Sequence, residues 1–206
     1  VDTRVHDELL GLIKEEVRRM FGEHPLDNEN YGHIVNVKHF ARARGLIDPD
    51  KVVLGGAARE TSLKIEPTIL DDVTPDDAVM QEEIFGPILP VLTFESLDEA
   101  EAFITDRPTP LALYIFSQDR AVQQRFVRYV PFGGGCVNDT IMHLATSHMG
   151  FGGMGASGMG QYHGRESFDT FSHKKSIVNK ATWVDVPFRY APYASWKHKF
   201  VRMFVH

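Results

Sequence analysis

Two acidic residues and one aromatic ring fall within the short stretch Gln81–Phe85, QEEIF. Adjacent residues of an extended chain point to opposite faces, so Glu82 and Glu83 cannot flank one bond as an acid and base pair. The same period places Glu83 and Phe85 on one side, a carboxylate acceptor beside a flat aromatic surface. That arrangement suits a sugar with vicinal hydroxyls attached to a planar ring. On composition alone, a solvated acidic turn followed by a core phenylalanine is the commoner interpretation.

A second candidate is the segment Gly153–Gly158, which has the G-x-G-x-x-G pattern of a dinucleotide-phosphate loop. Such a loop needs an apolar strand directly before it and a helix directly after it. The preceding residues, His143–His148, do not form that pattern. The run Gly152–Gly160 also contains more glycines than a phosphate turn requires. The sequence therefore favours a loop packed closely against another backbone over a nucleotide site.

The third candidate is Cys136, the only cysteine, with His143 following closely. A histidine near a cysteine can activate the thiol as a nucleophile. However, Cys136 lies between glycines and Val137 in a predicted strand, and free cysteine is among the most buried residue types. The sequence favours an inert core thiol. The histidines form no H-E-x-x-H pair and the stretch Asp71–Glu83 lacks EF-hand spacing, so we predict no metal site.

Composition places the chain among ordinary globular proteins. It has 206 residues, 43% of them hydrophobic and 24% charged, which is enough for one large domain or two small ones. The formal net charge of −6 gives no basic footprint, so nucleic acid is not an expected partner. A single cysteine excludes an intrachain disulfide and suits a reducing compartment. No apolar run in the sequence reaches the length of a membrane span.

The elements that must position these residues follow from hydrophobic periodicity. In the first half, apolar residues recur at helical spacing over Thr3–Phe21, with Gly22 as a stop signal. A shorter helix is predicted over Val37–Arg44. The stretch Lys51–Leu54 indicates a short strand. The segment Lys64–Leu70 is predicted to be extended, because its proline disfavours a helix.

Downstream, predicted strands and helices alternate. Strands are expected over Ile84–Phe94, Leu111–Phe116 and Gly133–Asn138. The middle strand is a continuous apolar run, which suits burial on both faces. One helix begins at Ser96 and another covers Arg120–Tyr129. This order predicts an α/β fold with a mostly parallel sheet flanked by helices.

Several segments together resemble the aldehyde dehydrogenase superfamily, most of all its class 3 branch of fatty-aldehyde and aromatic-aldehyde enzymes. The segments, in order, are GGAARETSLKIEPTIL, MQEEIFGPILPVLTF, PLALYIFSQD, GGCVND and FGGMGASGMGQYHGRESFDTFSH, and the resemblance covers essentially the whole chain. It implies an NAD(P)-dependent oxidation of a hydrophobic aldehyde, long-chain or aromatic, to the carboxylic acid through a cysteine thioester. The implied fold is that family's catalytic domain with an extended oligomerisation segment.

The resemblance assigns roles to five residues. The glutamate that matches Glu83 holds the nicotinamide ribose hydroxyls, and the phenylalanine that matches Phe85 packs near the ring of the NAD or NADP cofactor. Residues that match Ile141, Phe151 and His163 line part of the substrate funnel. The Gly-rich loop would therefore lie near the aldehyde and not at the cofactor phosphates.

The resemblance also implies that the catalytic residues lie elsewhere. The nucleophilic cysteine, the base glutamate, the oxyanion asparagine and almost the whole dinucleotide-binding domain would precede Val1. Cys136 does not match the nucleophile. We therefore expect no catalytic residue within this chain, which alone should be inactive. The alternative is a non-catalytic assembly or binding module derived from such an enzyme.

Three regions are expected. Residues 1–165 would be the carboxy-terminal part of the catalytic domain, and residues 166–185 a helix and an oligomerisation strand. In the second region, Ser172–Asn179 should pair with a sheet edge of a second subunit in a homodimer. Residues 186–206 would form an amphipathic tail. Its helix would pack on its own domain or, through residues 194–206, contact an anionic membrane surface or guard the substrate funnel. The expected location is the cytoplasm or the cytoplasmic face of an internal membrane.

Overall fold

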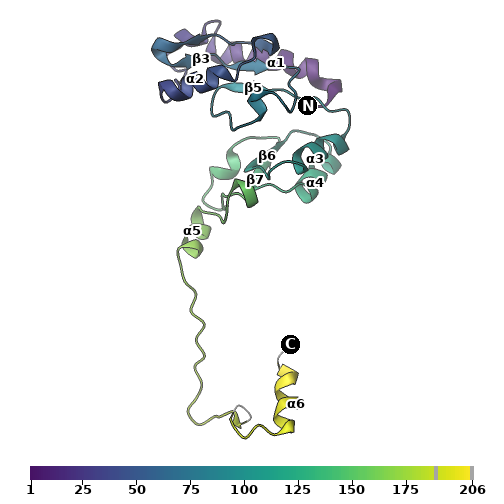
Figure 1. Ribbon diagram of the computed structural model, residues 1–206, viewed down its shortest axis with the longest axis vertical. Coiled ribbons are helices and arrows are strands. Elements are labelled where there is room, and N and C mark those ends of the chain that lie inside the picture. Colours follow the sequence, from purple (N-terminus) through teal and green to yellow (C-terminus); the bar gives the residue numbers. More distant parts are fainter. Residues whose placement is uncertain (188–189, 205–206) are drawn as a thin grey trace.

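A computed structural model describes residues 1–187 and 190–204 of the chain. Residues 1–94 form the upper part of the body in Figure 1, and residues 95–170 form the part below it. An extended segment then leads to a helix that lies apart from the body (Figure 1). Helices and short strands are mixed in both parts, so the fold class is α/β, as the sequence predicts.

The first part is built on a small mixed sheet. Its strands, in spatial order, are β1 (Val52–Leu54), β4 (Thr68–Leu70) and β5 (Ile88–Pro90). The pair β1 and β4 is antiparallel, whereas β4 and β5 are parallel. A separate antiparallel pair consists of β2 (Ala58–Arg59) and β3 (Lys64–Ile65). The predicted sheet is thus divided into small pieces, with both parallel and antiparallel pairs.

Two helices cover opposite faces of this sheet. Ile69 packs in one apolar cluster with Leu10 of α1 (His6–Phe21). Its neighbour Leu70 packs in another cluster with Phe40 of α2 (Val37–Gly45). Because successive strand residues point to opposite faces, α1 and α2 must lie on the two sides of β4. The centre of the sheet is therefore closed by apolar contacts on both faces.

The second part is a strand–helix–strand unit. The strands β6 (Ala112–Ile115) and β7 (Gly134–Val137) are parallel, and α4 (Arg120–Tyr129) connects them. The helix α3 (Leu97–Thr105) precedes β6. Ile115, Phe126 and Val130 form the buried core, against which apolar residues of α3 pack. The parallel pair and its crossover helix match the order predicted from the sequence.

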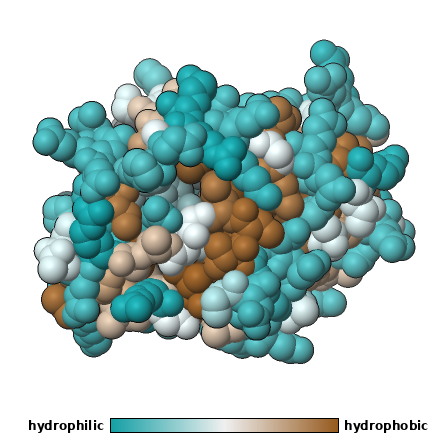
Figure 2. All heavy atoms as spheres, turned by 90° about the horizontal axis from the view of Figure 1, so that it is seen from above, coloured by the Kyte–Doolittle hydropathy of each residue, from teal (hydrophilic) through white to brown (hydrophobic). Residues whose placement is uncertain are grey.

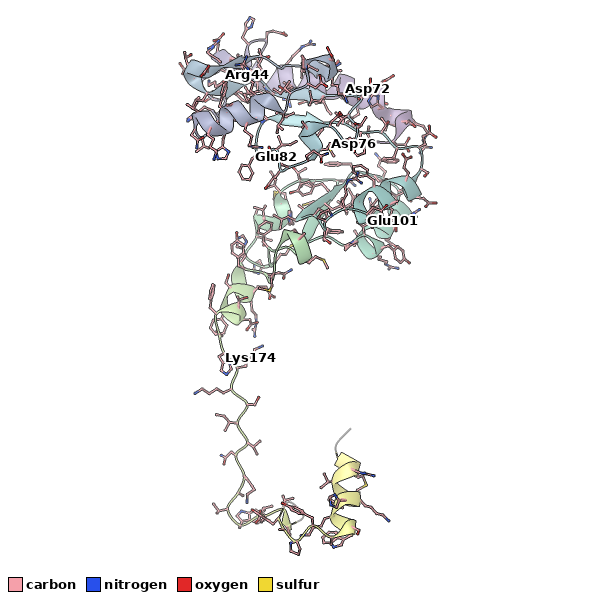
Figure 3. The ribbon with its side chains drawn as sticks, in the orientation of Figure 1. Arg44, Asp72, Asp76, Glu82, Glu101 and Lys174 are labelled. Carbon is pink, nitrogen blue, oxygen red and sulfur yellow. The ribbon has the colours of Figure 1, made fainter. Side chains whose placement is uncertain are left out.

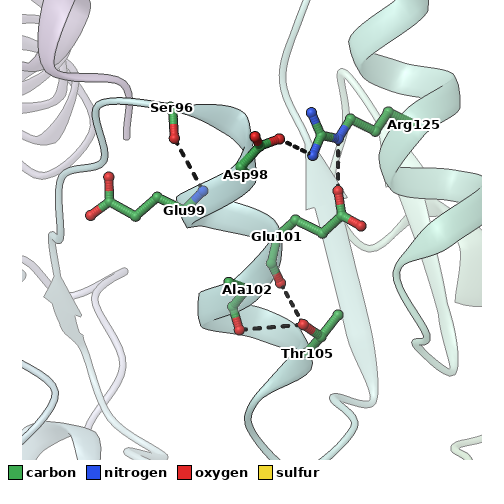
Figure 4. Close-up of polar contacts among 7 residues, drawn as sticks. All are labelled: Ser96, Asp98, Glu99, Glu101, Ala102, Thr105 and Arg125. Atoms are coloured by element: carbon green, nitrogen blue, oxygen red, sulfur yellow. Dashed lines mark hydrogen bonds and ion pairs between the residues drawn. The ribbon is translucent and has the colours of Figure 1, made fainter.

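Polar contacts connect α3 and α4 (Figure 4). Arg125 of α4 donates from Nε to Glu101 at 2.7 Å and from Nη2 to Asp98 at 2.5 Å. At the start of α3, the Ser96 hydroxyl accepts from the backbone N–H of Glu99 at 3.2 Å. The predicted helix start at Ser96 is confirmed, because its side chain supplies the N-cap.

Two strand predictions need correction. Of the predicted strand Ile84–Phe94, only Ile88–Pro90 forms a strand, and Phe94 makes an isolated bridge to Asp2. Phe85 lies in a loop with a φ of +47°. The run Leu111–Phe116 is not buried on both faces, since Leu111 is 41% and Phe116 67% exposed. Residues of this run instead line a groove of about 580 Å³ beside α1. Residues of α3 and α4 line the same groove.

Apolar surface is exposed around this groove and beyond it. Val5 and Leu12, which line the groove, and Met20 of α1 are about half exposed or more. Figure 2 shows the molecule from above, where hydrophobic side chains gather in the middle of a hydrophilic surface. Contiguous exposed apolar surface is typical of a region that another segment or chain covers.

The C-terminal segment begins after α5 (Gly164–Thr170). Within the described residues, Ser172–Asn179 is extended but pairs with no strand, so its pairing stays a prediction. The predicted tail helix is confirmed as α6 (Ser195–Phe204), and the last two residues of the tail, 205 and 206, lie outside the described residues. Helix α6 does not lie on the body of its own chain (Figure 1), contrary to the expectation that such a helix packs on its own domain. None of the described helices has the length and apolar character to cross a bilayer.

Candidate active site

The loop between residue 80 and β5 carries Glu83 and Phe85. Both side chains are exposed, Phe85 to 78%. The core-phenylalanine interpretation of Phe85 is therefore wrong. The alternation argument that placed Glu83 and Phe85 on one side also fails, because this stretch is no strand and Phe85 has a left-handed φ of +47°.

Left-handed backbone is costly for a bulky residue, on the order of 1–3 kcal/mol, and persists only where the surroundings enforce it. Here the residues on both sides of Phe85 are anchored to the first part. Ile84 packs against the apolar cluster that contains Phe40, and Gly86 lies over Ala43 of α2. An exposed aromatic ring held in strained backbone is the arrangement of a ligand-contacting loop.

Adjacent acids in this loop differ in their partners. The Glu82 carboxylate accepts from Arg42 at 2.8 Å. Within residues 1–187 and 190–204, no contact occupies the carboxylate of Glu83. Glu83 thus retains its full acceptor capacity for a ligand with hydroxyl groups.

The Gly-rich loop behaves as its composition predicts. A Cβ added to Gly152 would lie 2.1 Å from the carbonyl oxygen of Gly160, closer than real Cβ atoms approach. The two ends of the loop meet through Phe151 and Tyr162, whose backbones exchange hydrogen bonds of 2.8 and 3.0 Å. A short 3-10 helix over Gly155–Ser157 stands where a phosphate loop would begin an α-helix. The loop is packed on itself and is no dinucleotide-phosphate loop.

Aromatic side chains gather at the base of this loop. The rings of Phe151 and His163 stack with centroids 6.0 Å apart, and Tyr162 meets His163 edge-on at 4.3 Å. His143 continues the cluster, since its ring lies 5.7 Å from that of Phe151. Ile141 is 58% exposed and stands two residues before His143. The structure thus brings Phe151 and His163 together. It places Ile141 close in the chain to His143, whose ring lies against that of Phe151.

Comparison with known proteins decides what these features belong to. The sequence profile of the aldehyde dehydrogenase family matches residues 1–177. The chain belongs to the aldehyde dehydrogenase family. It is similar to the 4,4'-diaponeurosporen-aldehyde dehydrogenase of Staphylococcus aureus, with 48% identity over 99% of this chain and 45% of that protein. It is also similar to the bovine "Aldehyde dehydrogenase, dimeric NADP-preferring", with 43% identity over 86% of this chain and 74% of that sequence.

Further relatives, 43–45% identical, are named aldehyde dehydrogenase family 3 members, in agreement with the class 3 resemblance. Among solved structures, the substrate-bound state of Staphylococcus aureus AldH superposes with a TM-score of 0.92 at 48% identity. That superposition covers 99% of this chain and 45% of the solved one. This chain therefore spans a little under half the length of these Staphylococcus aureus relatives.

Within this aldehyde dehydrogenase chain, Cys136 is half-buried in β7. Its Sγ lies 3.6 Å from Nδ1 of His143, a side chain that is only 5% exposed. The thiol predicted to lie in the core is thus only partly buried, and it lies beside the histidine that follows it in the sequence. Among the described residues, no group of three or more histidine, cysteine, aspartate or glutamate side chains could hold a metal ion.

The five predicted site residues fall in two groups. Glu83 and Phe85 precede β5 in the first part, whereas Ile141, Phe151 and His163 lie around β7 and α5 in the second part (Figure 1). No described contact joins the two groups. Tyr162 joins this cluster without having been predicted, although its position beside His163 in the segment QYHG was a usable signal.

Proposed function

We propose that this chain is part of an NAD(P)-dependent aldehyde dehydrogenase that oxidises a hydrophobic aldehyde, long-chain or aromatic, to the carboxylic acid. The reaction proceeds through a cysteine thioester whose nucleophile lies upstream of this chain. The observation that carries the proposal is an exposed loop of a family member that carries Glu83, whose carboxylate has no partner among the described residues, and, two residues later, the exposed ring of Phe85 in strained backbone. Neither feature serves the core of the first part.

These two residues fit a nicotinamide cofactor. The cofactor, NAD or NADP, supplies the hydride acceptor when it is bound. The Glu83 carboxylate would accept hydrogen bonds from the two ribose hydroxyls, which are charge-assisted and hence strong. The Phe85 ring would pack near the nicotinamide and shield one face from water. The bovine relative is named as preferring NADP.

The aromatic cluster supports the substrate class. Phe151 and His163 offer flat, mostly apolar surface, and the exposed Ile141 extends it. Such a lining suits an aldehyde with a hydrocarbon chain or an aromatic ring, because its contacts replace water around apolar groups. No side chain in the cluster carries a permanent charge that would hold an ionic substrate.

The deciding experiment is Glu83→Gln in the full-length enzyme. Loss of charge-assisted bonds of about 1.5–3 kcal/mol should weaken cofactor positioning and slow hydride transfer, with the fold intact. Single-turnover rates with a good aldehyde measure the effect. Asp76→Asn is the matched control, since Asp76 is an exposed acid of the preceding loop (Figure 3). Unchanged single-turnover and steady-state rates in Glu83→Gln would show that Glu83 has no such role.

We also propose a homodimer in which Ser172–Asn179 adds to a sheet edge of the second subunit. In this segment Ile177 is 79% and Val178 93% exposed, and strands with unpaired backbone recruit partners. The bovine relative is named as dimeric. Val178→Asp should raise the dimer dissociation constant in sedimentation equilibrium. A strictly monomeric, folded parent protein at high concentration would refute the dimer.

The tail carries a final proposal, contact of residues 194–206 with an anionic membrane surface at the cytoplasmic face. In α6, Trp196 and Met203 are largely exposed, and Lys199 and Arg202 add positive charge. A basic amphipathic helix binds such surfaces through apolar insertion and charge attraction. Co-sedimentation with phosphatidylserine vesicles at low salt should fall when these residues are removed. Equal co-sedimentation with and without the tail would exclude this contact.

A further inference from the structure

Arg42 of α2 holds the loop that presents Glu83 and Phe85 through several hydrogen bonds. Nη1 of Arg42 donates to the carboxylate of Glu82 at 2.8 Å and to the backbone carbonyl of Glu83 at 3.1 Å. Nη2 donates to the carbonyl of Ile84 at 2.5 Å. A single guanidinium thus contacts three consecutive residues, the last of which directly precedes Phe85.

We propose that Arg42 is a positioning residue for the cofactor, one that fixes the path of this loop and so the places of the Glu83 carboxylate and the Phe85 ring. The inference rests on the proposed role of Glu83 and Phe85. Arg42 itself contacts neither of those side chains. Its action is on the backbone and on Glu82.

The helix that carries Arg42, α2, is packed firmly into the core. Arg42 is followed by Ala43, which is completely buried, and Phe40 on the same helix is 2% exposed. Both belong to the apolar cluster under the sheet, so α2 cannot shift without disturbing the core. The Arg42 side chain is itself 26% exposed, more shielded than the 49% of Glu82. Its hydrogen bonds therefore compete with water less than fully exposed ones do.

The chemistry requires arginine at this position. The guanidinium is a planar fork whose nitrogens point in fixed directions, so Nη1 and Nη2 can hold the carbonyls of Glu83 and Ile84 in one relative orientation. A lysine ammonium could reach one of these carbonyls but could not fix both. The same contacts restrain the residues next to Phe85, whose left-handed backbone needs enforcement by its surroundings.

Arg42 also separates the roles of the two acids. By pairing with Glu82, it occupies the carboxylate that would otherwise compete for a ligand's hydroxyls or for a cation. Glu83, the next residue, contributes only its backbone carbonyl to Arg42, so its carboxylate stays available. The pair Glu82–Glu83 is thus divided into one structural acid and one ligand-facing acid.

The test uses the full-length enzyme with three variants, Arg42→Ala, Arg42→Lys and Arg44→Ala. Arg44 is the matched control, an exposed arginine on the same helix, labelled with Glu82 in Figure 3. Arg42→Ala should raise the KM for NAD(P) by about tenfold or more, which corresponds to about 1.4 kcal/mol. The KM for the aldehyde should stay within about twofold. Arg42→Lys should restore only part of the loss, and Arg44→Ala should match the parent.

Comparison with Glu83→Gln separates the two proposals. If Arg42 acts through the loop, Arg42→Ala combined with Glu83→Gln will cost less than the sum of the two single changes. An effect of Glu83→Gln without any effect of Arg42→Ala overturns the positioning role alone. No effect of Glu83→Gln overturns the proposed function. If Arg42→Ala does not fold, Arg42→Lys decides, and a cofactor KM equal to that of the parent refutes the inference.

Discussion

The two parts of the body hold their functional loops in different ways. In the first part, the loop around Glu83 is fixed by a side chain, Arg42, that reaches out from a core closed on both faces. In the second part, the Gly-rich loop is fixed by backbone approaching backbone, with Gly152 against Gly160, and by stacked aromatic rings. The loop around Glu83 is thus held through a charged side chain, whereas the Gly-rich loop is held through glycines that carry no side chain and through aromatic rings.

This difference suits what each loop would contact. A cofactor with defined ribose hydroxyls requires a carboxylate at one place, which directional hydrogen bonds provide. A hydrophobic aldehyde needs shaped apolar surface, which close packing provides without charge. We therefore expect charge changes to act mainly on the cofactor side and volume changes mainly on the aldehyde side.

The largest expected effect is that of Gly152→Ala. Its Cβ would overlap the Gly160 carbonyl, and relief of that overlap must push the two ends of the loop apart. Overpacking of this kind costs about 1–3 kcal/mol. In the full-length enzyme, kcat/KM for the aldehyde should fall strongly while the KM for NAD(P) changes little. Steady-state kinetics with each substrate varied in turn measure both.

The matched control is Gly11→Ala, the same change in the interior of α1, where an added Cβ meets nothing within 4 Å. Removing a helix glycine should stabilise the protein by about 0.5–1 kcal/mol. If Gly152→Ala leaves aldehyde kinetics like those of Gly11→Ala, the close approach does not shape the funnel, and the comparison between the two parts fails.

The structure of each part could be predicted from the sequence where its contacts join residues close together in the chain, and not where they join residues far apart. Helix α4 has the predicted bounds because its cap is local, with the Asp119 side chain accepting from Ala121 at 2.7 Å. The loop before β5 was mispredicted as strand because Arg42, some forty residues earlier, fixes its path. No local pattern records such a contact. The stacking of Phe151 on His163 was likewise invisible, although both residues were assigned to one funnel by resemblance.

A smaller, pH-dependent effect is expected in the first part only. His6 at the start of α1 contacts Asp71, which follows β4, and Asp7, each at 2.8 Å. Hydrogen bonds to these carboxylates, that to Asp71 first, raise the pKa of His6 above its ordinary value. The protonated ring is thus favoured in the folded state. Its stabilisation is present below the unfolded pKa of about 6.5 and is lost as pH rises through the higher folded value.

His6→Gln should therefore lower the thermal midpoint more at about pH 5.5 than at about pH 8.5, because the stabilisation by the protonated ring declines as the pH rises. Differential scanning fluorimetry across this range is sufficient. His148→Gln, at an exposed position of the second part, is the matched control. A pH-independent difference for His6→Gln would show that the contact with Asp71 contributes no charge-dependent stability.

The smallest effect should come from Cys136→Ser, which tests whether the second part holds any chemistry of its own. The thiol is half-buried and approaches Nδ1 of His143 at 3.6 Å, and the histidine is held edge-on to Tyr114 with ring centroids 5.7 Å apart. A serine hydroxyl is smaller and can still bond to the ring, so the expected cost is a packing change of about 1 kcal/mol or less. Turnover of the full-length enzyme should persist, because the cysteine that we propose forms the thioester is a different residue. Complete loss of turnover in a folded Cys136→Ser protein would make the Cys136–His143 pair a catalytic centre, and the second part could no longer be described as a shaped apolar surface alone.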